Sequence, residues 1–316
     1  MTSLALTLLR GAALSAFKRA RPDAPLPGAV TARVRADVER LVAYERLCGF
    51  AAGRAGGAGG GDPLPVTYPH VLAFPGTMRL MAGRDFPLPL LGLVHTSVEI
   101  VQHHALLPAD ELELTTYAET LAPHRRGTEA TVVTRARLDG TPVWESRSTY
   151  LSRHRTPEPA PEDVLPVRDG QDPQAGPGPG PSAHAQWRLT GDLGRRYATV
   201  SGDRNPIHLH PLTARLFGFP RAIAHGMWTF ARCVAEHQRE AGSAADGGSG
   251  AALHVSAEFR APVLLPCSVT YAAAGEAFAL RGPTGRVHLS GAVRPAPPRD
   301  PGGIPRTPEP HHLPGR

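Results

Sequence analysis

The stretch YATVSGDRNPIH, from Tyr197 to His208, decides how this chain is interpreted. It holds a carboxylate, Asp203, and an imidazole, His208, five positions apart, with Asn205 and Pro206 between them. Pro206 lacks an N–H group and pushes Asn205 out of the helical region, so we expect both reactive side chains on a stiff loop. A purely structural turn would use the same residues, because Asp and Asn hydrogen-bond their own backbone.

A short helix and then a long helix are expected after this loop. Residues Pro211 to Phe217 suit a short helix, and from His225 onward apolar residues recur at helical spacing in GMWTFARCVAEH. Gly226, at the start of the long helix, leaves backbone N–H groups free to point at whatever lies before it. The sequence therefore predicts an acid and a base beside an anion-binding helix end.

These motifs together resemble the MaoC-like family of hot-dog-fold hydratases and dehydratases, which includes the R-specific enoyl-CoA hydratases. The residues that carry the resemblance are Ser201, Gly202, Asp203, Asn205, Pro206, Ile207, His208, Ala214, Gly218, Phe219, Ile223, His225, Gly226 and the run FRAPVLLP at Phe259 to Pro266. The chain departs from the family at His210, where many members carry an acidic residue. Because His210 lies outside the reactive pair, we expect it to modulate the activity more than to change the reaction.

The resemblance implies a hydro-lyase that reversibly hydrates trans-2-enoyl thioesters, on CoA or on an acyl-carrier protein, to (3R)-hydroxyacyl thioesters. Asp203 would orient and activate the water, His208 would help to move its protons, and the Gly226 N–H would bind the thioester oxygen as an oxyanion donor. The pair titrates as a unit, so the formal base stays open. The supporting loop residues are Ser201, Gly202, Asn205 and Pro206.

Two other functions remain open on the same fold. A hot-dog acyl thioesterase would share the substrate class but hydrolyse the thioester, and a non-catalytic acyl-thioester-binding protein would carry the substrate without turnover. The intact Asp-x-Asn-Pro-x-His loop favours hydration over both.

Low-complexity segments divide the chain into two folded parts. TPEPAPEDVLP and GPGPGP are typical of a linker, and the proline-rich C-terminal stretch is typical of disorder. Glycine-rich stretches at 53–61 and 242–250 indicate loops. The predicted divisions are an N-terminal segment (1–29), a degenerate N-terminal hot-dog half (30–155), a Pro/Gly-rich linker (156–182), a catalytic MaoC-like half (183–293) and a disordered tail (294–316).

An internal repeat relates the two halves. LHVSAEFRAPVLLP at Leu253 to Pro266 parallels VHTSVEIVQHHALLP at Val94 to Pro108, and the alternating residues predict a strand in each. His95 and His254 recur in both copies, so we interpret them as structural strand residues. Further strand-like runs are 112–118, 129–138, 143–151, 269–274, 277–281 and 286–293.

The order of these elements and the family resemblance together predict the α+β fold class. The specific expectation is a tandem (double) hot-dog fold, in which each half is a helix wrapped by a curved antiparallel sheet.

A second correspondence shows that only one half keeps the reactive pair. YERLCGF at Tyr44 to Phe50 aligns with YATVSGD at Tyr197 to Asp203, and Phe50 stands where Asp203 would be. The helix of the first half, around 69–82, also looks shorter than the one that begins at His225. The resemblance implies one active half, and one inactive half that makes room for a bulky acyl chain.

The same residue types could support other chemistry. Asp203, His208 and His210 could form a two-His-one-carboxylate metal site, but no further ligand cluster follows, so we expect no metal and no cofactor. Ser201 lacks a surrounding GxSxG motif, which favours a turn residue over a nucleophile. Cys233, inside the long helix, is interpreted as an inert core thiol.

Composition fits an ordinary enzyme. The chain has 316 residues, of which 41% are hydrophobic, and 34 − 28 = 6 net positive charges; Lys18 is the only lysine. No basic stripe with interleaved aromatic residues is present, so we expect no nucleic-acid partner. Three scattered cysteines argue against disulfides and for a cytoplasmic location. A duplicated chain is compatible with a monomeric pseudo-dimer or a homodimer.

The N-terminus is apolar and then basic, without an acidic residue before Asp23. Its basic residues follow the apolar run, unlike those of a secretory signal, and no stretch approaches the ~20 apolar residues of a membrane span. We expect an element packed on the first half; an acid-poor presequence and a peripheral amphipathic helix are the alternatives.

Overall fold

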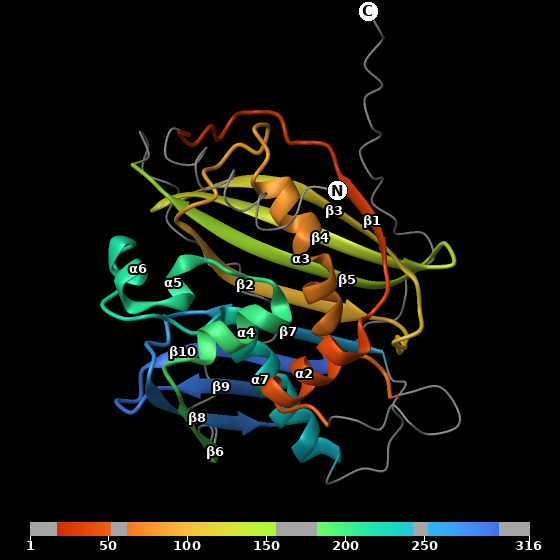
Figure 1. Cartoon of the computed structure of the whole chain (residues 1–316), viewed down its shortest axis with the longest axis vertical. Coiled ribbons are helices and arrows are strands. Elements are labelled where there is room, and N and C mark those ends of the chain that lie inside the picture. The colour runs from red at the N-terminus through yellow and green to blue at the C-terminus, as the bar shows by residue number, and fades with distance from the viewer. Residues whose placement is uncertain (1–17, 52–61, 156–181, 243–251, 297–316) are drawn as a thin grey trace, which may run out of the picture.

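The computed structural model describes residues 18–51, 62–155, 182–242 and 252–296. Ten strands in this part of the chain form one antiparallel sheet (Figure 1). The first half contributes β1 (Val30–Val34), β2 (Leu93–Gln102), β3 (Leu112–His124), β4 (Gly127–Leu138) and β5 (Thr141–Arg153). The second half contributes β6 (Ser182–Leu189), β7 (Leu253–Phe259), β8 (Cys267–Ala274), β9 (Ala277–Arg281) and β10 (Val287–Pro295).

The strand order shows the duplication. It runs β1-β3-β4-β5-β2-β7-β10-β9-β8-β6, so the second half repeats the first in mirror order across the β2–β7 junction. These two strands pair antiparallel from Ser97 opposite Glu258 to Gln102 opposite Leu253. The two copies of the sequence repeat are therefore the strands that join the halves, through a continuous backbone hydrogen-bond ladder.

Each half carries helices, and one helix of each half packs on its part of the sheet. The first carries α2 (Val38–Cys48) and α3 (Tyr68–Met81), and the second carries α4 (Leu193–Ser201), α5 (Pro206–Leu209), α6 (Pro211–Leu216) and α7 (Gly226–Gly242). Figure 1 shows α3 and α7 in front of their own strands, and α3 contacts β1, β3 and β4 while α7 contacts β7, β9 and β10. At 14 residues α3 is shorter than α7 at 17, as predicted.

The alignment of YERLCGF with YATVSGD is confirmed by the geometry of α2 and α4. Both helices end on a glycine in the left-handed conformation, Gly49 at φ 82° and Gly202 at φ 81°, where a side chain would be strained. The rings of Tyr44 and Tyr197 lie 6.3 Å apart, centroid to centroid. The same short sequence pattern therefore forms the same helix end in both halves.

The core lies between the helices and the sheet. Alternate residues of the joining strands point into it, Val98 and Ile100 from β2 and Val255 and Ala257 from β7, and all are nearly inaccessible to solvent. Trp144 on β5 is also buried, and its indole N–H donates to the Val66 carbonyl at 2.8 Å. Burying one such large side chain stabilises the fold by roughly 1.5–3 kcal/mol.

Several sequence-based boundaries differ from the structure. The edge strands β1 and β6 were not predicted, because each is short and has only one neighbour in the sheet. Ser182, assigned to the linker, begins β6, and Arg294 and Pro295, assigned to the tail, extend β10. Most of the predicted linker, glycine-rich loops and tail lies outside the described residues.

The described end of the N-terminal segment contacts the first half. The Lys18 ammonium donates to the Gly83 carbonyl at 2.9 Å, and the Arg21 N–H donates to the Pro87 carbonyl at 3.0 Å. Of the helices in the described ranges, none has the length and apolar character needed to cross a membrane.

Candidate active site

The loop that carries Asp203 begins where α4 ends. Ser201, which is 3% exposed, donates its hydroxyl to the Tyr197 carbonyl at 2.8 Å and accepts the Asp203 N–H at 3.1 Å. Gly202 then reverses the chain in the left-handed conformation. With both bonds inside the turn, the Ser201 hydroxyl acts as a turn residue, and Asp203 leaves the helix in a fixed direction.

The loop is shorter than the sequence suggested. The Asp203 carboxylate accepts the Asn205 N–H at 3.0 Å, and the Asn205 side chain accepts the Ile207 N–H at 3.4 Å. Pro206 is therefore the first residue of a one-turn helix, α5, which contains His208. The prediction that His208 lies on a loop is therefore wrong, because Pro is tolerated at the first helical position, where its missing N–H has no partner to lose. Asn205 itself, at ψ 125°, is non-helical as expected.

His208 is held as a neutral base. Its Nδ1 lies 2.8 Å from the Ile223 carbonyl oxygen, which can only accept, so Nδ1 carries the proton and Nε2 presents a lone pair. Burial lowers the pKa of His208, against an opposing effect of the Asp203 charge. Near pH 7 the ring is therefore uncharged and able to accept a proton.

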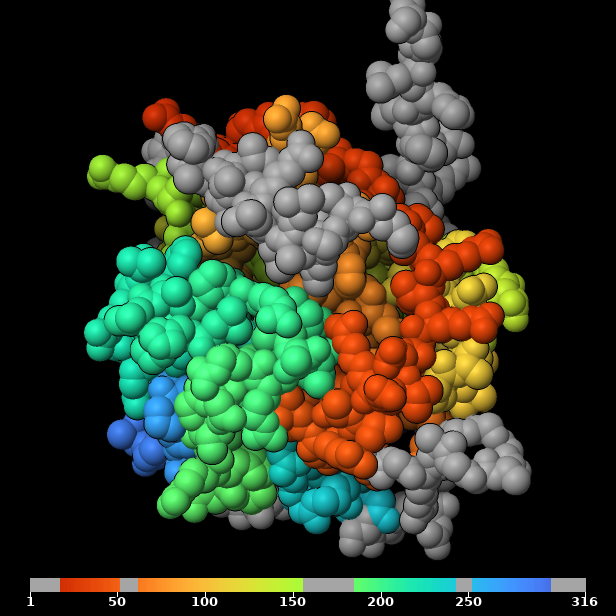
Figure 2. Space-filling view, in the orientation of Figure 1, coloured from red at the N-terminus to blue at the C-terminus, as the bar shows by residue number. Residues whose placement is uncertain are grey.

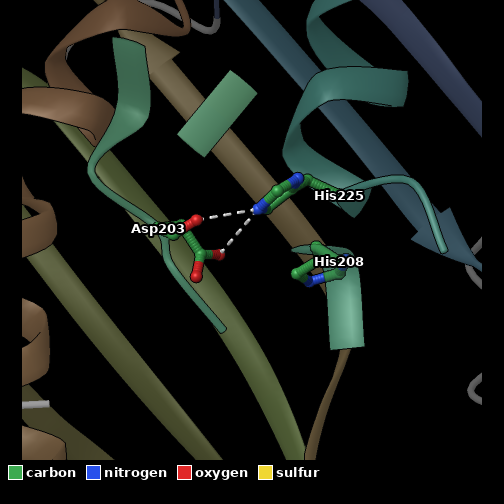
Figure 3. A group of neighbouring side chains, drawn as sticks. All are labelled: Asp203, His208 and His225. Carbon is green, nitrogen blue, oxygen red and sulfur yellow. Dashed lines mark hydrogen bonds and ion pairs between the residues drawn. The ribbon is translucent and has the colours of Figure 1, made fainter. Parts of the chain in front are cut away.

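A third residue, His225, completes the site, and we did not predict a role for it. It is 2% exposed and stacks on His208 with ring centroids 3.8 Å apart. Its Nε2 donates to the Asp203 backbone carbonyl at 3.0 Å and lies 3.8 Å from the Asp203 carboxylate (Figure 3). The sequence could have indicated this position, because His225 directly precedes Gly226 in the matched motif.

The three side chains do not fit a metal ion. One ligand atom from each of Asp203, His208 and His225 lies within 4.8 Å of the others. However, a metal bound by histidine lies in the ring plane about 2.0–2.1 Å from nitrogen, and two rings stacked 3.8 Å apart and tilted by 25° cannot both aim at one such point. His210 is exposed, and its Nδ1 accepts the Leu212 N–H at 3.2 Å at the start of α6, so it does not join the group.

Gly226 begins α7, as predicted. Among the described residues its N–H makes no hydrogen bond outside α7, and the first N–H of a helix has no partner inside it. A Cβ atom built on Gly226 would lie 3.0 Å from the Phe259 ring, which is tighter than ordinary contact. A side chain here would therefore press on Phe259, whereas glycine leaves the N–H approachable.

The first half contributes titratable side chains to the same region. His70, near the start of α3, and Tyr150, on β5, are both close enough to Asp203 for its charge to act on their pKa values. The His95 ring stacks on Tyr150 at 4.6 Å and lies 4.8 Å from Phe259, centroid to centroid. The first half therefore places polar rings, besides apolar ones, near Asp203.

A β-bulge turns His95 inward. Register between β2 and β5 shifts between His95 and Ser97, so His95 pairs with Tyr150 and falls on the core-facing side. Its repeat partner His254 lies on the unbulged β7, and its Nε2 is 2.7 Å from the Glu99 carboxylate. The repeat suggested one structural role for both histidines, but the bulge places them in different surroundings.

These buried histidines predict acid sensitivity of the fold. Burial lowers the pKa of His70 to about 4 and that of His95 to about 3, against an ordinary value of 6.5. Below pH 6.5 the unfolded chain binds protons that the folded chain refuses, so stability falls as pH falls, by about 1.4 kcal/mol per pH unit for each such histidine. Urea unfolding at pH 7, 6 and 5 measures this slope.

A pair of variants isolates the contribution of His95 to this pH dependence. His95→Phe keeps an aromatic ring and should reduce the pH dependence of the unfolding free energy by about one proton between pH 6 and pH 5. His104→Gln, at an exposed position, should leave the slope unchanged. Equal slopes in the wild type and His95→Phe would contradict the assignment.

Comparison with known proteins agrees with this geometry. Residues 174–277 match the family model of the MaoC like domain. The 3-hydroxyacyl-thioester dehydratase X of Mycobacterium tuberculosis is 37% identical over 242 residues, which cover 74% of this chain and 80% of that protein.

Solved structures show the same fold. The crystal structure of HtdX of Mycobacterium tuberculosis matches with a TM-score of 0.68 and 31% identity, over 84% of this chain and 99% of that one. A MaoC-like dehydratase from Phytophthora capsici matches in fold at 18% identity, with a TM-score of 0.64, over 87% and 96% of the two chains. The predicted α+β tandem hot-dog fold is therefore confirmed, and the chain belongs to the MaoC-like dehydratase family.

Proposed function

We propose that the protein is a hydro-lyase that reversibly adds water to trans-2-enoyl thioesters and gives (3R)-hydroxyacyl thioesters. One observation carries the proposal: a neutral His208, with its Nε2 lone pair available, lies beside the Asp203 carboxylate. The dehydratase activity in the name of the mycobacterial relative supports the same reaction class.

The geometry suits one water held between two acceptors. A water molecule that donates two hydrogen bonds of ordinary length joins acceptors about 4–5 Å apart. A carboxylate oxygen of Asp203 lies within 4.8 Å of a ring nitrogen of His208, which is compatible with such a water. In hydration the water oxygen bonds to C3 and gives one proton to this coupled pair. The C2–C3 π electrons move toward the thioester, and C2 then receives that proton from the pair, which returns to its starting state.

The developing charge falls on the thioester oxygen. We assign the Gly226 N–H as its donor, because the α7 start faces the site and that N–H has no partner of its own among the described residues. One such donor contributes roughly 3–4 kcal/mol to the transition state. Ser201, Gly202, Asn205 and Pro206 hold the pair in place and do not react.

The finer assignments belong to the same proposal. The half built from β6–β10 carries the reaction, and the half built from β1–β5 holds the acyl chain. Cys48, Cys233 and Cys267 are free thiols, which supports a reducing cytoplasmic location. The β2–β7 ladder supplies inside one chain the pairing of two hot-dog units, which supports a monomeric pseudo-dimer, with a homodimer as the alternative.

The test uses the purified full chain with crotonyl-CoA, longer 2-enoyl-CoAs and the matching carrier-protein thioesters. Loss of the conjugated double bond should proceed without release of free thiol, and chiral analysis should give the (3R) product. Release of thiol would instead identify a thioesterase. Inertness on every chain length and on both carriers would overturn the proposal.

A further inference from the structure

The helix next to the catalytic loop exposes large apolar side chains. On α6, Leu212 is 63% exposed and Leu216 is 83% exposed, and Phe217, which follows, is 36% exposed. The opposite side of α6 is anchored, because Ala214 is fully buried and the Thr213 hydroxyl donates to the Pro206 carbonyl at 2.6 Å. These residues therefore form a fixed apolar surface rather than a frayed end, and exposed apolar groups that gather at one place mark interaction sites.

The same stretch is strongly basic. Residues 195–221 contain five arginines and one acidic residue, Asp203, a net charge of 5 − 1 = +4. Three of the exposed arginines, Arg195, Arg215 and Arg221, donate to the backbone carbonyls of Leu209, Pro220 and Pro266. A carbonyl orients a guanidinium but does not neutralise it, so this surface presents positive charge to the solvent.

This surface adjoins the reactive pair. α6 begins at Pro211, three residues after His208, and Thr213 is bonded back to the turn that contains His208. In Figure 2 the residues around α6 form part of the left edge of the molecule, next to the segments of α4 and α5. A partner bound there would stand beside the turn that carries His208.

We propose that this surface, the α6 patch (Leu212, Arg215, Leu216, Phe217 and Arg221), docks an acyl carrier protein that delivers the thioester. The inference rests on the proposed function and deepens it, since it names the carrier. The matching partner surface is acidic and amphipathic, with carboxylates for the arginines and apolar side chains for the leucines. CoA would offer phosphates to the arginines but much less apolar surface than a folded carrier protein to cover Leu212 and Leu216.

A membrane surface is the less favoured occupant. α6 has six residues and three apolar side chains, whereas helices that bind the membrane interface usually bury a long apolar face. A second copy of this chain is also less favoured, because two surfaces with the same excess of arginine repel each other.

The experiment compares one acyl group on two carriers. Crotonyl carrier protein and crotonyl-CoA are assayed with the wild type and with the double variant Arg215→Glu, Leu216→Ser. We expect kcat/KM for the carrier-protein substrate to fall at least tenfold, and that for crotonyl-CoA to change less than twofold. The control, Val38→Ser with Arg46→Glu, makes the same change of charge and a similar loss of an apolar side chain at exposed positions of α2, on the other side of α4 in Figure 1. It should change neither kcat/KM value.

A binding measurement tests the docking surface independently of the proposed hydration. The Kd of butyryl carrier protein, a saturated thioester, is measured by titration calorimetry and does not depend on turnover. A tenfold weaker Kd in the double variant supports docking even if no hydration is found. Equal Kd values for the variant and the wild type overturn the proposal. So does binding through the α6 patch to phosphatidylglycerol–phosphatidylcholine vesicles, or a wild-type dimer that the double variant dissociates.

Discussion

Replacement of Asp203 by asparagine is expected to lower kcat/KM for enoyl-thioester hydration by about 100- to 10,000-fold without loss of fold. Asparagine has the same shape and keeps an oxygen that can accept the Asn205 N–H, now at 3.0 Å, so the turn is retained. What is lost is the negative charge that acts on His208 and the second acceptor for the water. The measurements are steady-state kinetics with crotonyl-CoA and a thermal unfolding curve.

The matched control for this variant is Asp192→Asn. Asp192 lies at the start of the same helix that leads to Asp203, but its carboxylate is bonded to Thr190 and does not face His208. It should retain wild-type kinetics. Full activity in Asp203→Asn, or an equal loss in both variants, would show that the charge of Asp203 is not used.

Gly194→Ala should inactivate and destabilise the protein, although alanine favours a helix by about 1 kcal/mol over glycine. Gly194 is buried in the first turn of α4, and a Cβ atom there would overlap the backbone carbonyl oxygen of His208. To relieve the overlap α5 has to move, and His208 moves with it away from Asp203. We expect at least a 100-fold loss of kcat/KM and roughly 1–3 kcal/mol lower free energy of unfolding.

A lower free energy of unfolding in Gly194→Ala would show that the packing clash outweighs the gain in helix propensity. Gly242→Ala is the control, because Gly242 ends α7 and no atom lies within 4 Å of its added Cβ. This variant should be as active as the wild type and equally or slightly more stable. If Gly194→Ala matched Gly242→Ala in both measurements, the close contact of α4 with α5 would not exist in solution.

Most of the fold followed from local patterns in the chain. The strand at 277–281 and the C-terminal end of the strand at 138 were predicted to the residue. The short edge strands β1 and β6 were missed. Their pairing with β3 and β8 depends on distant segments and leaves little trace in five or eight residues.

The candidate site likewise combines features set by local sequence with features set by long-range contacts. By itself the sequence determined the Asp203–His208 pair, the turn at Gly202 and the helix start at Gly226, because caps, turns and proline act over a few residues. Only the tertiary structure decided that His225 rather than His210 joins the pair, that a bulge turns His95 inward, and that α4 leaves no room for a side chain at Gly194. Each of these depends on a contact between segments that approach only after the sheet and helices have packed.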